Sequence, residues 1–526
     1  MNVWDQVVVG AGSAGCVVAG RLAERGHRVL LLEAGTDQPA GMPASHPLAD
    51  PGRLVLEGHN WAYEANLRTP AARATAGDRA RWCRFPYRLG KGVGGSSAVN
   101  GAVGLRALPA DVDAWAAAGN PEWAWHDVLP WFNAIEADRD ASGPGHGRTG
   151  PMPVTRPASE EVAAVDDAFL IACAGIGVPV RDDLNDGTEH AAGRVPATVA
   201  DARRVDAAAA FLAGARGRPG FALRTGVQVN RVLFDRGRAT GVELVGPDGA
   251  ERVVAGEVVL CAGAVGTPPI LFRSGIGDAT TVRALGLPVV ADLPGVGNNL
   301  TDHASVVLWA RASADQPAPV GRRWRDVAAR LPGGVDDTVD VQVGLLHHTD
   351  PATIPALAGR TGGARLLGMS VMLMRPRSRG RVAITSTDPS ALPQIDLAIV
   401  EHADDLERLS AGVRTAWRLL HAPGVRPAID EVLFWSERTI AEDAVLRAAV
   451  RNLAAPGWHP TGTARMGPAD DPTTVVDQWC GVHGVPGLRV VDASVFPAIP
   501  GVPTNLTTIM LAERVSAAME AQPCPT

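Results

Sequence analysis

Several features that would place the chain in a common class of protein are missing. The 526 residues include only six cysteines, without any Cys-x-x-Cys spacing, so we expect neither a disulfide framework nor a zinc or other metal site. Basic residues are not in excess: 49 lysines and arginines face 56 aspartates and glutamates, and the net charge of −7 disfavours nucleic-acid binding. No internal repeat is evident, and the glycines and prolines are dispersed.

Long hydrophobic runs are also missing. No uninterrupted apolar stretch approaches the ~20 residues that a membrane-spanning helix needs. The first residues contain neither the basic segment nor the cleavage site of a secretory signal. We therefore expect no transmembrane segment and a cytoplasmic location. Hydrophobic residues still make up 46% of the chain, and its length predicts two or more structural units, whereas the oligomeric state stays open.

The N-terminal region contains a dinucleotide-binding pattern. An apolar run at 7–9 leads into the glycine-rich turn 10–15, an amphipathic segment follows at 17–24, and a second apolar run at 29–32 ends on Glu33. Glycines at this turn permit a pyrophosphate to approach a helix N-terminus, and an acid about 20 residues further on can accept from a ribose diol. The order predicts a βαβ unit.

Further along the chain, short apolar runs predict more strands. Those before residue 262 are expected to return to the first domain, and the later ones predict an antiparallel sheet with one covered face, because apolar and polar residues alternate. A proline- and glycine-rich segment, 143–151, predicts a hinge where the chain leaves the first domain. The strand candidates are 221–224, 231–234, 241–245, 258–261, 339–343 and 369–373.

Glycine-rich and small-residue segments recur where the backbone would pass close to a flat ligand. Together with several longer motifs, these segments closely resemble the glucose-methanol-choline (GMC) oxidoreductases. Their sequences are nearest to hydroxymethylfurfural oxidase and aryl-alcohol oxidase-like members. The segments that carry the resemblance are 88–103, 262–271, 274–277, 294–303, 375–382, 458–467, 491–497 and 503–508.

The resemblance implies the fold. It is an α/β FAD-binding domain, Rossmann-like in its βαβ unit, interleaved with a smaller α+β substrate domain built on an antiparallel sheet. The FAD-binding domain is expected at 1–155, 216–310 and 451–526, a connecting part of the substrate domain at 156–215, and the substrate-binding domain itself at 311–450.

Two residues carry the expected chemistry. In alcohol oxidation a hydroxyl proton leaves while a hydride moves to the flavin. An imidazole with a pKa near ~6.5 suits the proton, and a neutral amide can donate to the developing alkoxide. The resemblance implies His459 as base and Asn505 as its partner. Asn505 is also a candidate cap for a helix expected to begin there, with its positive end toward the flavin.

The resemblance also implies the residues that hold FAD, at its pyrophosphate, adenosine and flavin parts. Trp61 is the loosest of these, since a core tryptophan is nearly as good an interpretation. No histidine stands between Lys91 and Asp111, so FAD is expected to bind without a covalent link there. The expected set is Gly10, Gly12, Ser13, Ala14, Gly15, Glu33, Ala34, Trp61, Gly92, Gly95, Asn100, Gly101, Ala102, Val103, Val229, Ala262, Gly263, Trp458, Asp492, Ala493, Thr504 and Thr507.

The substrate class follows less directly. Few aromatic residues stand between 311 and 451, so a cage for a choline-type cation would be thin. We expect a neutral primary alcohol, aromatic, furanic or allylic, with electrons passing to O₂ or another acceptor. A choline-type or mycofactocin-associated dehydrogenase, and a flavin-containing hydroxynitrile lyase, remain alternatives.

Overall fold

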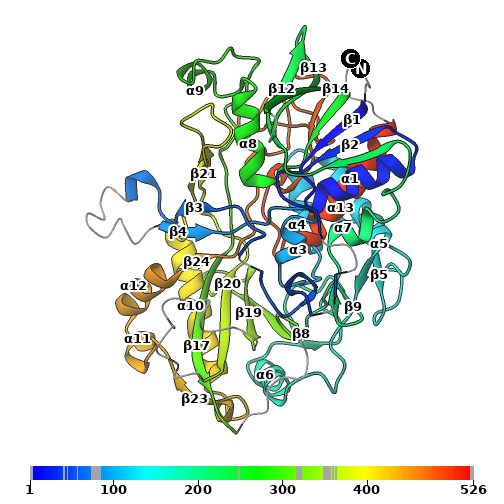
Figure 1. Cartoon of the computed structure of the whole chain (residues 1–526). Helices are drawn as coiled ribbons and strands as arrows, with labels where there is room; N and C mark the ends of the chain where they lie inside the picture. The colour runs from blue at the N-terminus through cyan, green and yellow to red at the C-terminus, as the bar shows by residue number, and fades with distance from the viewer. Residues whose placement is uncertain are drawn as a thin grey trace.

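The computed structural model describes residues 4–38, 42–43, 45–55, 57–72, 84–246, 249–315, 323–347, 357, 361 and 364–521. Two large sheets organise the molecule, the first in the upper part of Figure 1 and the second in the lower part.

Of the six cysteines, Cys83 and Cys524 lie outside the described residues, and the other four are buried free thiols. No helix in the described part of the chain is both long and apolar enough to cross a membrane.

The first sheet has seven strands in the order β11-β2-β1-β14-β13-β12, with β25 paired to β14. The pairs among β11, β2, β1, β14 and β25 are parallel, and β12 and β13 add an antiparallel edge. The predicted βαβ unit is confirmed. The strands are β1 Trp4–Val9, β2 Val29–Leu32, β11 Phe221–Arg224, β12 Gln228–Asp235, β13 Arg238–Gly246, β14 Gly249–Leu260 and β25 Leu488–Val490.

Helix α1 (Ser13–Glu24) connects β1 to β2 and packs against α13 (Asn505–Ala521). The turn before α1 needs glycine, because Gly10 has φ 99° and a Cβ there would lie 2.6 Å from the Cys261 carbonyl oxygen. The turn therefore brings the start of α1 close to the end of β14, which is where a Rossmann-like sheet binds its ligand.

The second sheet has eight strands in the order β23-β17-β20-β19-β18-β8-β7, with β24 paired to β17. Helix α10 (Ala403–Leu420) packs on one face, against β17, β19 and β20 (Figure 1). The strands are β7 Val180–Arg181, β8 Ala191–Arg194, β17 Ala304–Ala312, β18 Val327–Pro332, β19 Val339–Leu346, β20 Leu366–Leu373, β23 Ile429–Val432 and β24 Ala455–Pro456.

The antiparallel pairing of β19 with β20 is as predicted, but the prediction of one covered face is wrong. Nearly every residue of both strands is buried. One face packs on α10, and residues of the other face close a cavity that is described below. Alternation along a strand reports polarity, and here polar side chains such as Gln342 face the cavity rather than bulk solvent.

Four strands join the N-terminal part of the chain to its middle. They form a sheet in the order β21-β22-β3-β4, in which β3 (Tyr63–Asn66) runs parallel to β22 (Gln394–Asp396). In the second sheet, β17 begins at Ala304 and β24 lies at 455–456, so its strands cross the expected limits at residues 310 and 451. The two units are therefore interleaved along the chain more finely than the sequence segments suggest.

The remaining helices and strands lie outside the two large sheets. The helices are α3 Ser96–Val99, α4 Pro109–Ala117, α5 Trp125–Ile135, α6 Ala164–Gly175, α7 Ala207–Phe211, α8 Gly263–Arg273, α9 Ala279–Ala284, α11 Glu437–Ala441 and α12 Asp443–Leu453. The strands are β4 Arg84–Tyr87, β5 Glu136–Asp138, β6 Met152–Val154, β9 Val199–Ala200, β10 Arg203–Arg204, β15 Ile276–Gly277, β16 Ala291–Asp292 and β21 Arg381–Ala383.

Candidate active site

A cavity of about 2080 Å³ is lined by residues of both large sheets. It is larger than the roughly 300–1,000 Å³ of a pocket for one small molecule. It takes in most of the residues that the sequence predicts for the site, from segments hundreds of residues apart. These are Gly10, Gly12, Ser13, Ala14, Glu33, Ala34, Trp61, Gly95, Asn100, Gly101, Val103, Val229, Ala262, Gly263, Trp458, His459, Asp492, Ala493, Thr504 and Asn505.

Four predicted residues do not line the cavity, and each has a packing role instead. A Cβ on Gly15 would lie 1.8 Å from the Gly10 carbonyl oxygen, so this glycine allows the turn to close. The Gly92 N–H donates to Glu33 Oε1 at 3.0 Å, and the Ala102 N–H donates to Asn100 Oδ1 at 2.9 Å. Thr507 is fully buried in the first turn of α13.

Helices α1, α8 and α13 all begin at the cavity. Gly12, just before α1, and Gly263, the first residue of α8, both line it, and a Cβ on either would meet no protein atom within 4 Å. The Cα of each glycine therefore faces open space. Asp492 orients the start of α8, because its Oδ2 accepts from the Gly263 N–H at 2.8 Å. Helix N-termini favour anionic groups such as a pyrophosphate.

Glu33 lines the cavity, but its carboxylate is already engaged. It accepts from the backbone N–H groups of Ala11 at 2.9 Å, Gly35 at 2.8 Å and Gly92 at 3.0 Å. A carboxylate offers about four acceptor positions, so a ribose hydroxyl could take one more. Glu33 therefore ties the two glycine-rich segments together in addition to any ligand contact.

The geometry of His459 is set by a buried acid. The backbone N–H of His459 donates to Asp302 Oδ1 at 2.8 Å, and the Tyr87 hydroxyl donates to Asp302 Oδ2. Burial raises the pKa of Asp302 to about 7. Trp458, just before, has φ 60°, an uncommon backbone conformation for a residue with a side chain. This local strain and the anchor to Asp302 present the His459 ring to the cavity.

A second histidine, His303, determines which ring nitrogen of His459 carries the proton. His303 is fully buried, its Nε2 lies 3.0 Å from the Pro500 carbonyl oxygen, and its Nδ1 lies 2.9 Å from His459 Nδ1. Because the carbonyl can only accept, neutral His303 carries its proton on Nε2 and accepts at Nδ1. His459 then donates from Nδ1, which leaves the lone pair on its Nε2. Burial, and then the charge of Arg325, lower the pKa of His459 to about 4.

Asn505 is the first residue of α13 and stands at the same cavity. Its Oδ1 accepts from the Ser13 hydroxyl at 2.8 Å. This bond connects the start of α13 to the start of α1 and leaves the amide Nδ2 group to donate. Asn505 and His459 thus line one cavity, the first with a hydrogen-bond donor and the second with an unprotonated nitrogen.

The residues fit a large, partly anionic and partly flat ligand such as FAD. The glycine turn at the start of α1 suits a pyrophosphate. The Trp458 indole N–H is buried without an acceptor among the described residues, and Trp458 lines the cavity 6.0 Å from the Phe85 ring. Trp61 lies further along, stacked on Tyr63 with ring centroids 5.5 Å apart. A planar ligand with acceptors would satisfy the orphaned donor.

The sequence reasoning missed Asp302, His303, Tyr87 and Arg325. The first two stand inside a segment that carries the family resemblance, but nothing in their spacing predicts that they support His459. Met372 also lines the cavity, whereas Met369 is fully buried in the core.

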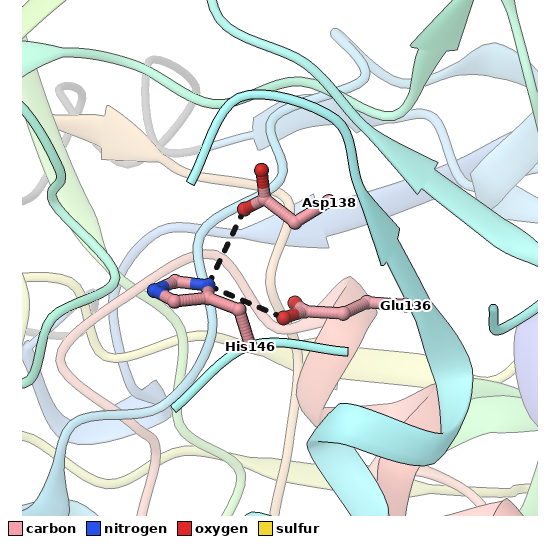
Figure 2. Close-up of side chains that lie close together, drawn as sticks. All are labelled: Glu136, Asp138 and His146. Atoms are coloured by element: carbon pink, nitrogen blue, oxygen red, sulfur yellow. Dashed lines mark ion pairs between the residues drawn. The ribbon is translucent and has the colours of Figure 1, made fainter. Parts of the chain in front are cut away.

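Away from the cavity, His146 stands between two carboxylates (Figure 2). Its Nδ1 lies 3.4 Å from Glu136 Oε1 and 3.4 Å from Asp138 Oδ2. Arg106 Nη1 lies 3.4 Å from Glu136, and Arg156 Nη1 lies 2.9 Å from Asp138. Asp183 also belongs to the cluster, 3.1 Å from His146 Nε2 and paired with Arg156, so two guanidinium groups and the imidazole hold three carboxylates in an ion-pair network. The network ties segment 143–151, for which the sequence predicts a hinge, to β5 through Glu136 and Asp138.

Asp166, Asp326 and His347 form another cluster, with ligand atoms within 4.8 Å of one another. His347 Nε2 lies 2.7 Å from Asp166 Oδ1. Both carboxylate oxygens of Asp326 lack a hydrogen-bond partner within the described part of the chain, and burial raises the pKa of Asp326 to about 6. None of the three lines the cavity. The sequence predicted no metal site, and these residues were not candidates there.

The chain matches a known protein family along most of its length. Two GMC oxidoreductase family models match residues 4–305 and 376–512. The chain is 34% identical to a 5-(hydroxymethyl)furfural oxidase from Methylovorus sp., over 99% of both chains. It is 35% identical to an oxygen-dependent choline dehydrogenase from Stenotrophomonas maltophilia, over 98% of this chain and 94% of the other.

Among solved structures, a pyridoxine 4-oxidase from Mesorbium loti superposes with a TM-score of 0.87 at 29% identity, over 99% of this chain and all of the other. The similarity thus extends over both sheets and the cavity between them, and the resemblance seen in the sequence is confirmed. The chain is an oxidoreductase enzyme and belongs to the GMC oxidoreductase family.

Proposed function

We propose that the chain binds FAD non-covalently and oxidises a primary alcohol, aromatic, furanic or allylic, to the aldehyde, with His459 as base and Asn505 as its partner. The observation that carries the proposal is the pairing of His459 with His303, which leaves His459 Nε2 unprotonated in the cavity. A cytoplasmic location remains a prediction.

His459 would take the hydroxyl proton. Its pKa of about 4 keeps the ring neutral near pH 7, so Nε2 can accept. The amide group of Asn505 would donate to the alkoxide as charge develops on oxygen. Bound FAD would supply the acceptor for the hydride that leaves the same carbon, and its electrons would pass to O₂ or another acceptor.

The start of α1 at Ser13 and Ala14 would hold the FAD pyrophosphate, with Asp492 and Ala493 beside it, and Asn100 to Val103 would border the flavin. Glu33 and Val229 would serve the adenosine half. Among the described residues that line the cavity, His459 is the only histidine. This supports non-covalent binding, because no second imidazole faces the cavity there.

The test is the anaerobic absorbance of the holoenzyme on adding benzylic, furanic, aliphatic and quaternary-ammonium alcohols, followed by air. Bleaching by the benzylic or furanic alcohols supports the proposal. Fast recovery with peroxide then identifies O₂ as acceptor, and slow recovery another acceptor. Absence of bleaching, together with release of an aldehyde and cyanide from a cyanohydrin, would instead indicate a lyase. Acid denaturation followed by filtration should release FAD into the filtrate; retention with the protein would contradict non-covalent binding.

A further inference from the structure

Arg325 is an arginine in the cavity wall that the chemistry above does not use. It stands just before β18, lines the cavity and is 7% exposed. Its Nη1 donates to Gln342 Oε1 at 3.0 Å, and its Nη2 donates to the Ser370 hydroxyl. Both acceptors are neutral side chains of the second sheet. The Nε–H is buried without an acceptor among the residues that the structure describes.

No carboxylate among the described residues pairs with Arg325. Burial alone lowers its pKa to about 10, so the group stays charged at neutral pH. Asp326, the next residue, lies instead with Asp166 and His347. Taking a cation out of water costs several kcal/mol unless an opposite charge is supplied. The missing charge is therefore expected from a ligand.

Arg325 stands close enough to His459 for its charge to lower the pKa of that ring. Its neighbour Trp324 packs on the cofactor-binding segment, since a Cβ on Gly101 would lie 2.6 Å from Trp324 Cδ1. Trp309 and Met372 line the same cavity. The guanidinium thus lies in a part of the cavity that is lined by neutral side chains, polar and apolar, and that it shares with the base.

We propose that the alcohol substrate carries a carboxylate, which Arg325 binds while His459 faces the hydroxyl. A monoanion balances one guanidinium, whose Nη N–H groups not used by Gln342 and Ser370 are left to donate to a carboxylate. The same charge repels a quaternary ammonium, which disfavours a choline-type substrate. This inference rests on the proposed function. The carboxylate is unchanged in the reaction, in which the C–O–H group alone loses a proton and a hydride.

The test compares 4-(hydroxymethyl)benzoate with its methyl ester, which has the same alcohol but no charge. In the wild-type holoenzyme kcat/KM for the acid should exceed that for the ester by about 10- to 100-fold, the range of a charged hydrogen bond. In Arg325→Met this ratio should fall toward one, and Arg325→Lys should give an intermediate ratio. Arg323→Met is the matched control, because Arg323 does not line the cavity, and it should keep the wild-type ratio.

Binding of unreactive 4-methylbenzoate, followed by the flavin spectrum and by calorimetry, separates this inference from the proposed function. If neither alcohol bleaches the flavin but 4-methylbenzoate binds wild type at least tenfold more tightly than Arg325→Met, the anion site stands and the oxidation proposal fails. FAD content and thermal unfolding check that each variant is folded. An equal loss on acid and ester, or 4-methylbenzoate binding that is unchanged in the variant, would overturn the inference.

Discussion

His459 can act as a base only if its ring is neutral and its lone pair faces the cavity, and both conditions depend on its neighbours. Replacement by alanine should lower the rate constant of flavin reduction by about 10²–10⁴-fold, the usual range for loss of a general base. FAD should stay bound, since the helix N-termini are untouched. Stopped-flow absorbance measures the rate, with exposed His126→Ala as control. Normal reduction by the variant would remove His459 from the mechanism.

The pH dependence of that step follows from the lowered pKa. The neutral ring is the active form, so the rate constant should fall as pH drops through about 4. Removing the positive charge in Arg325→Met should raise the pKa of His459 and move the acid limb to higher pH. A pH profile of anaerobic reduction measures both. A wild-type limb near pH 6.5 would show that the ring is not perturbed.

At the residue scale, sequence reasoning succeeds where a residue belongs to a motif. His459 and Asn505 stand in segments with specific spelling, and both line the cavity. His303 and Arg325 act through contacts made only after folding, with partners such as Pro500 and Ser370. No periodicity in the chain encodes those contacts, so the sequence alone could not reveal them.

Among the elements, α1 depends on a close approach to α7. A Cβ on Gly20 would lie 2.4 Å from the Phe211 carbonyl oxygen, so Gly20→Ala must move one helix. The free energy of unfolding should fall by about 1–3 kcal/mol, as for other overpacked sites. Guanidinium unfolding of the holoenzyme measures it.

The matched control for Gly20 is the last residue of α6. Gly175 is exposed, and a Cβ there would meet nothing within 4 Å. Gly175→Ala should leave stability unchanged or raise it by up to about 1 kcal/mol, because alanine favours the helix. Equal effects of the two substitutions would contradict close packing of α1 on α7.

Elements with strong local signals are predicted well. Strands β2 and β11 have the expected bounds, and α13 begins at Asn505 as expected. The covered faces of β19 were not predicted, because a polar side chain such as Gln342 looks solvent-facing in sequence although it lines an internal cavity. Pairing of β3 with β22 joins segments about 330 residues apart, which local patterns cannot specify.

In the whole molecule the cavity is lined by residues of both large sheets, so a ligand bound there should stabilise both. A ligand that binds only the folded state adds about 2.7 kcal/mol when its free concentration is 100 times Kd. Removal of FAD should therefore lower Tm, and added FAD should restore it in a concentration-dependent way. Differential scanning calorimetry measures the shift, and riboflavin, which lacks the pyrophosphate, should restore less.

Gly12→Val tests whether the start of α1 contributes to the increase in Tm that bound FAD causes. The added side chain would meet no protein atom at Cβ but would enter the cavity, so the apo protein should keep its Tm. Its FAD-dependent rise in Tm should be smaller than in wild type, because the pyrophosphate would lose its approach to the helix N-terminus. A full FAD-dependent rise in this variant would place the pyrophosphate elsewhere in the cavity.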